Sequence, residues 1–203
     1  MYPGERFNTC THLPGLVLAV LGLPVLLAKT LPGGNAAKIA GALVFALSCV
    51  ALYAASTLFH SARGEAKLRW QRVDHCAIYL LIAGSYTPFA LVTLQGTWGW
   101  MLLVSVWGIA AFGIWRELRS AAAGPSLALY IGMGWIGVAA TIPLMARLEV
   151  GGLVWLLVGA ILYTAGTIFY VNRAGYRHAH GLWHLFVLGG TASHYAAIVG
   201  FVV

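Results

Sequence analysis

Long intervals without a single Lys, Arg, Asp or Glu are the feature that most restricts how this chain can fold. Six of them cover most of the sequence: 7–28, 39–62, 75–115, 120–146, 150–172 and 178–203. A helix needs about 20 mostly apolar residues to cross the hydrocarbon layer of a bilayer, and charged side chains are expensive inside that layer. With 61% hydrophobic and only 8% charged residues, the chain is predicted to be an all-α integral membrane protein.

The number of spans follows from the lengths of these intervals. Five match a single crossing, and the third is long enough for two, with a natural break at the polar, glycine-containing turn 95–99. The sequence therefore predicts one domain, 1–203, containing a bundle of seven transmembrane helices. The approximate spans are 13–30, 36–60, 73–94, 98–116, 125–146, 150–171 and 178–201. Pro24, Pro88 and Pro143 lie within spans and are expected to kink them.

The distribution of Lys and Arg predicts the orientation of the bundle. The face with the N-terminus and the loops after the second, fourth and sixth helices carries nine basic residues, and the other face carries three. Loops rich in Lys and Arg stay in the cytoplasm, so the N-terminus is expected inside and the C-terminus outside. We expect a multi-pass protein of the cell (inner) membrane, with its first span retained because no cleavage site follows a short apolar region.

The net charge of +7 does not indicate nucleic-acid binding, because the basic residues are divided among loops and form no single patch. Positive flanks of membrane helices produce the same excess. The three cysteines, Cys10, Cys49 and Cys76, form no CxxC motif and are expected to be free thiols.

Six of the seven histidines are predicted to gather at the cytoplasmic end of the bundle. His180 and His184 are four residues apart, so they share one helical face, a spacing that lets two imidazoles bind one metal ion. His60, at the cytoplasmic end of the second helix, is the best candidate for a third ligand. Three neutral imidazoles and a water molecule are the usual outline of a catalytic zinc site.

Ser56 and Asp74 are expected close to these histidines. Ser56 lies one turn deeper than His60 on the same helical face, and Asp74 begins the third helix at the same end. A carboxylate beside a zinc-bound water can take its proton. The alternatives are an ion pair of Asp74 with Arg72 or with an arginine of a neighbouring loop, and a hydrogen bond from Ser56 to the carbonyl of Leu52.

Three motifs, in order, resemble a known family. They are Glu5-x-x-Asn8-x-x-Thr11-His12, Ser56-x-x-x-His60 followed by Asp74, and His180-x-x-x-His184. With Gly84-Ser85-Tyr86-Thr87-Pro88 and Trp183-His184-Leu185-Phe186-Val187, the chain is similar over nearly its whole length to the hemolysin III family. That family is the bacterial branch of the progestin and adipoQ receptor (PAQR) superfamily.

The resemblance implies seven helices with a cytoplasmic N-terminus. It implies a zinc ion on His60, His180 and His184, with Asp74 placed by the zinc-bound water and Ser56 nearby. Eukaryotic relatives look like hydrolases of lipid amides such as ceramide, so a membrane lipid is the expected substrate or ligand.

The remaining polar residues of this end have expected roles outside the direct ligand set. Glu5, Asn8 and His12 are expected to support the zinc ligands from the N-terminal segment, with Asn8 or Thr9 also capping the first helix. We expect His75 to contact a neighbouring helix or a headgroup. His178 is expected to be interfacial, and His194 to be a core histidine too deep for the same ion.

Three functions remain open from the sequence. The first is a zinc-dependent, ceramidase-like hydrolase of a lipid amide or ester. The second is a sensor or receptor of membrane state with structural zinc. The third, weaker because the polar groups cluster at one end only, is a cytolytic pore.

Overall fold

A computed structural model describes residues 1–2, 4–119 and 124–203 of the chain. The described residues form helices and no strands. Five spans are single α-helices: α1 Glu5–Thr30, α2 Ala36–Ser61, α4 Gly96–Arg119, α7 Val150–Val171 and α8 Ala179–Phe201. The third span consists of α3 Gly64–Pro88 and the π-helical turn η1 Phe89–Leu94, which continues it. The fifth span is divided into α5 Leu127–Trp135, the 3₁₀ turn η2 Ile136–Ala140 and α6 Thr141–Met145.

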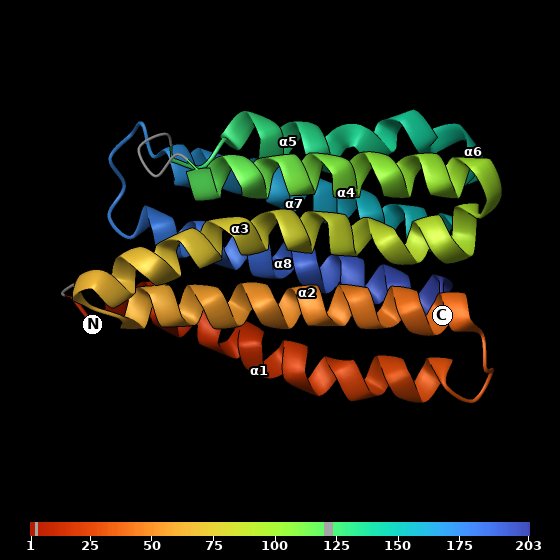
Figure 1. Ribbon diagram of the computed structural model, residues 1–203, viewed down its shortest axis with the longest axis horizontal. Helices are drawn as coiled ribbons and strands as arrows, with labels where there is room; N and C mark the ends of the chain where they lie inside the picture. The colour runs from red at the N-terminus through yellow and green to blue at the C-terminus, as the bar shows by residue number, and fades with distance from the viewer. Residues whose placement is uncertain (3, 120–123) are drawn as a thin grey trace.

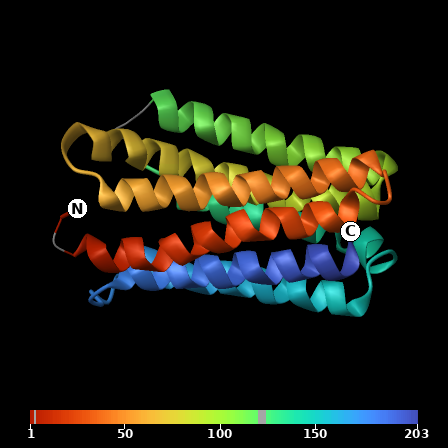
Figure 2. The same ribbon diagram turned by 90° about the horizontal axis from the view of Figure 1, so that it is seen from below.

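Seven helical segments are long and apolar enough to cross a membrane, which confirms the predicted all-α transmembrane bundle. They run side by side and alternate in direction, so the N-terminus and the C-terminus lie at opposite ends (Figures 1 and 2). The α2–α3 and α7–α8 connections lie at the same end as the N-terminus. We call this the N-terminal end of the bundle.

Two helices begin well before the predicted spans. Helix α1 begins at Glu5, where the apolar pattern predicted residue 13, and α3 begins at Gly64, where it predicted residue 73. Charged residues keep a segment out of the hydrocarbon layer but do not prevent it from being helical. The apolar pattern therefore predicts only the part of each helix that crosses the membrane, and the first turns of α1 and α3 precede that part. The expected capping of the first helix by Asn8 or Thr9 is therefore wrong, because its N-cap is Gly4, which makes no side-chain cap bond.

Helix regularity is lost near two of the three expected kinks. Pro88 is the last residue of α3, directly before the π-helical turn. In the fifth span the α-helix ends before Pro143, at the 3₁₀ turn Ile136–Ala140. The Tyr86 hydroxyl donates to the carbonyl of Gly134 at 2.5 Å and accepts from the amide of Gly137 at 3.2 Å, which satisfies backbone groups at this break. Helix α1 continues through Pro24.

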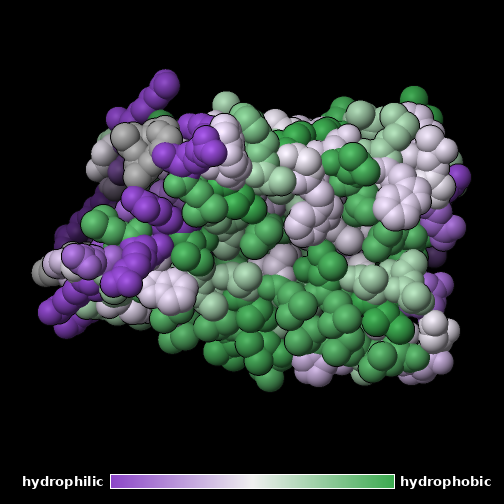
Figure 3. Space-filling view, viewed as in Figure 1, coloured by the Kyte–Doolittle hydropathy of each residue, from purple (hydrophilic) through white to green (hydrophobic). Residues whose placement is uncertain are grey.

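The surface has the pattern of a membrane protein. Large apolar side chains are exposed along the length of the bundle, among them Val104, Ile142 and Val150. Hydrophilic residues gather mainly at the N-terminal end, with a smaller group at the other end (Figure 3). The interior is filled by aromatic and aliphatic side chains such as Phe45 and Tyr53. All three cysteines are free.

Candidate metal centre

Three histidines from two helices meet at the N-terminal end of the bundle. His60 lies in the last turn of α2, and His180 and His184 lie in the first two turns of α8. One ring nitrogen of each lies within 4.8 Å of the other two. The ring centroids are 4.6 to 5.0 Å apart, and His60 and His184 are only 2% and 1% exposed. The three residues named from the sequence are thus close enough to bind one metal ion.

Glu5 fixes which nitrogen of His60 can serve as a ligand. Its Oε2 lies 2.6 Å from His60 Nδ1, while the carboxylate also accepts from Lys67 Nζ at 2.7 Å and Asn8 Nδ2 at 2.9 Å. A carboxylate held by a lysine is an acceptor only, so Nδ1 carries the proton and Nε2 keeps a lone pair. That Nε2 is buried and has no partner among the described residues. A buried nitrogen without a partner is costly, and a metal ion would satisfy it.

The backbone of α1 orients His184 in the same way. Its Nδ1 lies 3.1 Å from the carbonyl oxygen of Asn8 and 3.0 Å from the hydroxyl of Thr11. The Thr11 hydroxyl already donates to that carbonyl at 2.8 Å, so Nδ1 is the donor and Nε2 is free. Metal-binding histidines usually donate their second N–H to a carboxylate or carbonyl. Both rings have this arrangement, so the donor set fits a metal ion.

His12 supports the site from within α1 and does not belong to the three-nitrogen group. Its ring stacks on His184 at a centroid distance of 3.6 Å, and its Nδ1 lies 2.7 Å from Ser56 Oγ. Ser56 is therefore engaged with His12, and the alternative hydrogen bond to the carbonyl of Leu52 is not formed. Glu5, Asn8 and His12 thus contact either the metal-site histidines or Ser56.

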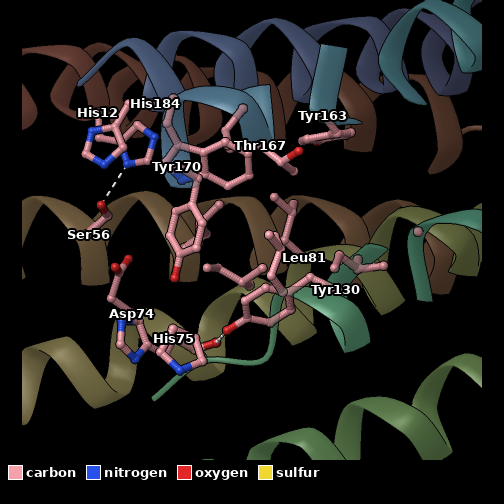
Figure 4. Close-up of a pocket in the computed structure, with 18 of the residues that line it drawn as sticks. His12, Ser56, Asp74, His75, Leu81, Tyr130, Tyr163, Thr167, Tyr170 and His184 are labelled. Carbon is pink, nitrogen blue, oxygen red and sulfur yellow. Dashed lines mark hydrogen bonds between the residues drawn. The ribbon is translucent and has the colours of Figure 1, made fainter. Parts of the chain in front are cut away.

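Asp74 reaches the site from the third helix. It is 8% exposed, and its carboxylate points toward Ser56 (Figure 4). Within the described part of the chain Asp74 forms no ion pair, so the alternative bridge to Arg72 is not realised. Asp74 and the three histidines line the same cavity, and a carboxylate in such a position can exchange a proton with a bound molecule.

A cavity of about 680 Å³ opens from the three histidines into the bundle. Ser56 and Asp74 line its wall near the histidines, and its other lining residues are mainly aliphatic and aromatic side chains of α3, α5, α7 and α8. Tyr170, Thr167 and Tyr163 follow one another along one wall (Figure 4). The volume is in the range of pockets that bind small organic molecules.

The other histidines lie outside the metal-binding group. His75 Nδ1 lies 2.7 Å from Glu117 Oε1 of α4, so its expected contact with a neighbouring helix is present. His178 is the N-cap of α8, and its ring meets Phe7 edge-on at 5.4 Å. His194 packs against Tyr163 in the interior.

Three residues form hydrogen bonds at the N-terminal end of the bundle although the sequence predicted no such contact for them. Lys67 is one of the nine basic residues counted at this end and falls outside the predicted third span, but it lies in the first turn of α3 and its Nζ donates to Glu5. Thr11 was part of a motif without an assigned contact, and its position three residues after Asn8 was the available signal. Glu117 follows the fourth predicted span and lies between Arg116 and Arg119, where a charged residue gives no indication of a buried site.

Comparison with known proteins agrees with this arrangement. The sequence profile described as "Haemolysin-III related" matches residues 2–195. The chain is 39% identical to "Hemolysin-3 homolog" of Bacillus subtilis (strain 168) over 202 residues, covering 98% of this chain and 94% of that protein. It is 38% identical to "Hemolysin-3" of Bacillus cereus over 204 residues, covering 98% and 92%.

A more distant similarity extends to a human PAQR-type protein. "Monocyte to macrophage differentiation factor" of Homo sapiens is 28% identical over 203 residues, covering 94% of this chain and 81% of the human protein. The profile match over nearly the whole chain and the two bacterial relatives together show that this chain belongs to the haemolysin-III-related family of multi-pass membrane proteins.

Proposed function

We propose that the protein is a zinc-dependent hydrolase that cleaves an amide or ester bond of a membrane lipid. One observation carries the proposal: three imidazoles close enough to hold one metal ion line the same mainly apolar cavity as the carboxylate of Asp74, which forms no ion pair among the described residues. Such a cavity suits an acyl chain, and the polar end suits the bond to be cleaved.

The metal ligands in this proposal are His60, His180 and His184. A zinc ion there supplies Lewis-acid polarisation of an acyl carbonyl and increases the acidity of a neighbouring water. Asp74 accepts the proton of the attacking water. Ser56 donates to the oxygen of the carbonyl as charge develops on it, while its Oγ accepts the Nδ1 proton of His12.

The decisive test removes the proton acceptor and keeps the metal ligands. Asp74→Asn preserves the shape of the side chain and leaves the three histidines in place, so zinc content should stay at the wild-type level. Fatty-acid release should fall by about 10²–10⁴-fold, the usual contribution of a general base. The assay is mass spectrometry of fatty acid released from N-acyl lipids, such as ceramide, by protein in lipid nanodiscs. Elemental analysis of the same samples measures zinc.

Glu65→Gln is the matched control, because Glu65 is an exposed carboxylate on the same helix. It should leave both readings unchanged. Full turnover by the zinc-loaded Asp74→Asn protein would eliminate the mechanism, and a wild-type protein that cleaves no acyl lipid would eliminate the hydrolase.

A sensor or receptor with structural zinc is the second candidate. The ligands and their partners come from α1, α2 and α8, so a bound ion would tie three helices together. This function predicts that lipid is bound without cleavage and that His60→Ala mainly lowers the melting temperature. A lytic pore, suggested by the name of the bacterial relatives, has less support, because the cavity beyond the three histidines is mainly apolar.

A further inference from the structure

A second pair of titratable side chains lies beside the metal centre and takes no part in it. His75 follows Asp74 on α3, and Glu117 lies near the end of α4. His75 Nδ1 and Glu117 Oε1 are 2.7 Å apart. Glu117 is only 4% exposed, and its Oε2 has no partner among the described residues. A carboxylate buried in this way depends on the histidine, because an unpaired buried charge is costly.

The pair leaves one nitrogen of His75 available. Glu117 accepts through its carboxylate, so Nδ1 carries a proton and Nε2 is the other reactive atom of the ring. That Nε2 has no hydrogen-bond partner and is not enclosed by the described residues. His75 also lines the same cavity as Asp74.

The position of the ring is held by three helices. Glu117 of α4 fixes its Nδ1, and the hydroxyl of Tyr130, from α5, donates to the backbone carbonyl of His75 at 2.9 Å. Tyr130 in turn packs on Tyr79 of α3 at a centroid distance of 4.5 Å. Asp74 and His75, consecutive residues of α3, both line the cavity (Figure 4). A histidine oriented by a buried carboxylate is the usual means of positioning a proton donor.

We propose that His75, oriented by Glu117, protonates the leaving group of the lipid. This inference rests on the proposed hydrolase. When the bond between the acyl carbon and the nitrogen or oxygen of the leaving group breaks, the electron pair stays on the leaving atom, which takes the Nε2 proton of the imidazolium. His75 becomes neutral. Its Nδ1 keeps its proton, which remains hydrogen-bonded to the Glu117 carboxylate.

The proton balance then closes within the site. Attack by water adds its oxygen to the acyl carbon and leaves one proton on Asp74. That proton returns to the neighbouring His75 Nε2, directly or through water in the cavity. One water is consumed for each acid and each amine or alcohol released, and both side chains regain their starting states.

The test compares two substrates with the same acyl chain. An amine leaving group needs a proton before it departs, whereas the p-nitrophenolate of an activated ester does not. His75→Gln should lower kcat for the amide by about 10²–10⁴-fold, with little change in KM, and leave hydrolysis of the p-nitrophenyl ester close to wild type. Glu117→Gln should show the same selectivity with a smaller loss, because its amide still holds the ring but stabilises the imidazolium less.

Each outcome decides the proposal. An equal loss on both substrates, or full amide turnover by His75→Gln, would overturn the donor role while the hydrolase stands. If His75→Gln does not fold, as judged from its melting temperature and zinc content, the selectivity of Glu117→Gln decides in its place. A wild-type protein that is inactive on both substrates would instead remove the hydrolase and this inference together.

Discussion

At the scale of single residues, metal binding by His60 and His184 would depend on which nitrogen of each ring carries a lone pair. His60 and His184 present Nε2 because Glu5 and the carbonyl of Asn8 hold the Nδ1 protons. These partners all come from α1, so the first two turns of that helix preorganise ligands that belong to α2 and α8. Partners of this kind contribute substantially to metal affinity without touching the ion.

Glu5→Gln tests this contribution. A neutral amide holds the Nδ1 proton of His60 less strongly and loses the ion pair with Lys67, so zinc affinity should fall by about 10–100-fold. Competition with a chromogenic chelator measures the dissociation constant. The exposed Glu65→Gln should bind zinc as the wild type does, and an unchanged affinity for Glu5→Gln would mean that the α1 contact is incidental.

At the scale of elements, close contact between α2 and α3 places Asp74 of α3 opposite Ser56 of α2 (Figure 4). Gly84 makes this contact possible, because a Cβ atom added there would lie about 2.2 Å from Ser48 Oγ of α2. Ser48 cannot easily move, since it is buried and its hydroxyl donates to the carbonyl of Phe45 at 2.7 Å. Small residues allow membrane helices to approach in this way.

Gly84→Ala should therefore force α2 and α3 apart and lower the free energy of unfolding by about 1–3 kcal/mol, the usual cost of overpacking. Thermal unfolding in detergent, followed by circular dichroism, measures the change. Gly108→Ala in α4 is the matched control, because a Cβ atom there meets nothing within 4 Å, and Ala is the better helix former. Equal melting temperatures for the two variants would contradict the packing argument.

At the scale of the whole molecule, the metal centre lies at the end that carries most of the basic residues. We propose that this N-terminal end faces the cytoplasm, because nine of the twelve Lys and Arg residues belong to it. The candidate metal centre would then lie near the inner leaflet of the cell membrane, and the C-terminus would lie outside.

Cysteine labelling tests this orientation. In a protein whose Cys10, Cys49 and Cys76 are replaced by Ser, a membrane-impermeant maleimide should label Gly33→Cys in intact cells and should not label Ala174→Cys. Both positions are exposed, in the α1–α2 and α7–α8 connections respectively. Permeabilised cells should show labelling of both. The reverse pattern in intact cells would place the metal centre on the outer side.

The sequence alone determined the seven spans, the alternation of the helices and the gathering of His60, His180 and His184 at one end. Exclusion of charge from hydrocarbon acts on each segment separately, and alternation of direction then decides which helix ends meet. These are local properties, so they can be read without knowing how the helices pack.

Only the tertiary structure decided which side chains touch. The pairs Glu5 with His60 and His75 with Glu117 join residues far apart in the sequence. Glu5 and Lys67 form an ion pair from the first turns of α1 and α3. Both residues lie outside the apolar intervals, so hydropathy does not predict that they are helical. Such contacts depend on how each helix is rotated about its axis and how closely neighbours approach. In lipid both faces of a helix can be apolar, so hydropathy carries little information about that rotation.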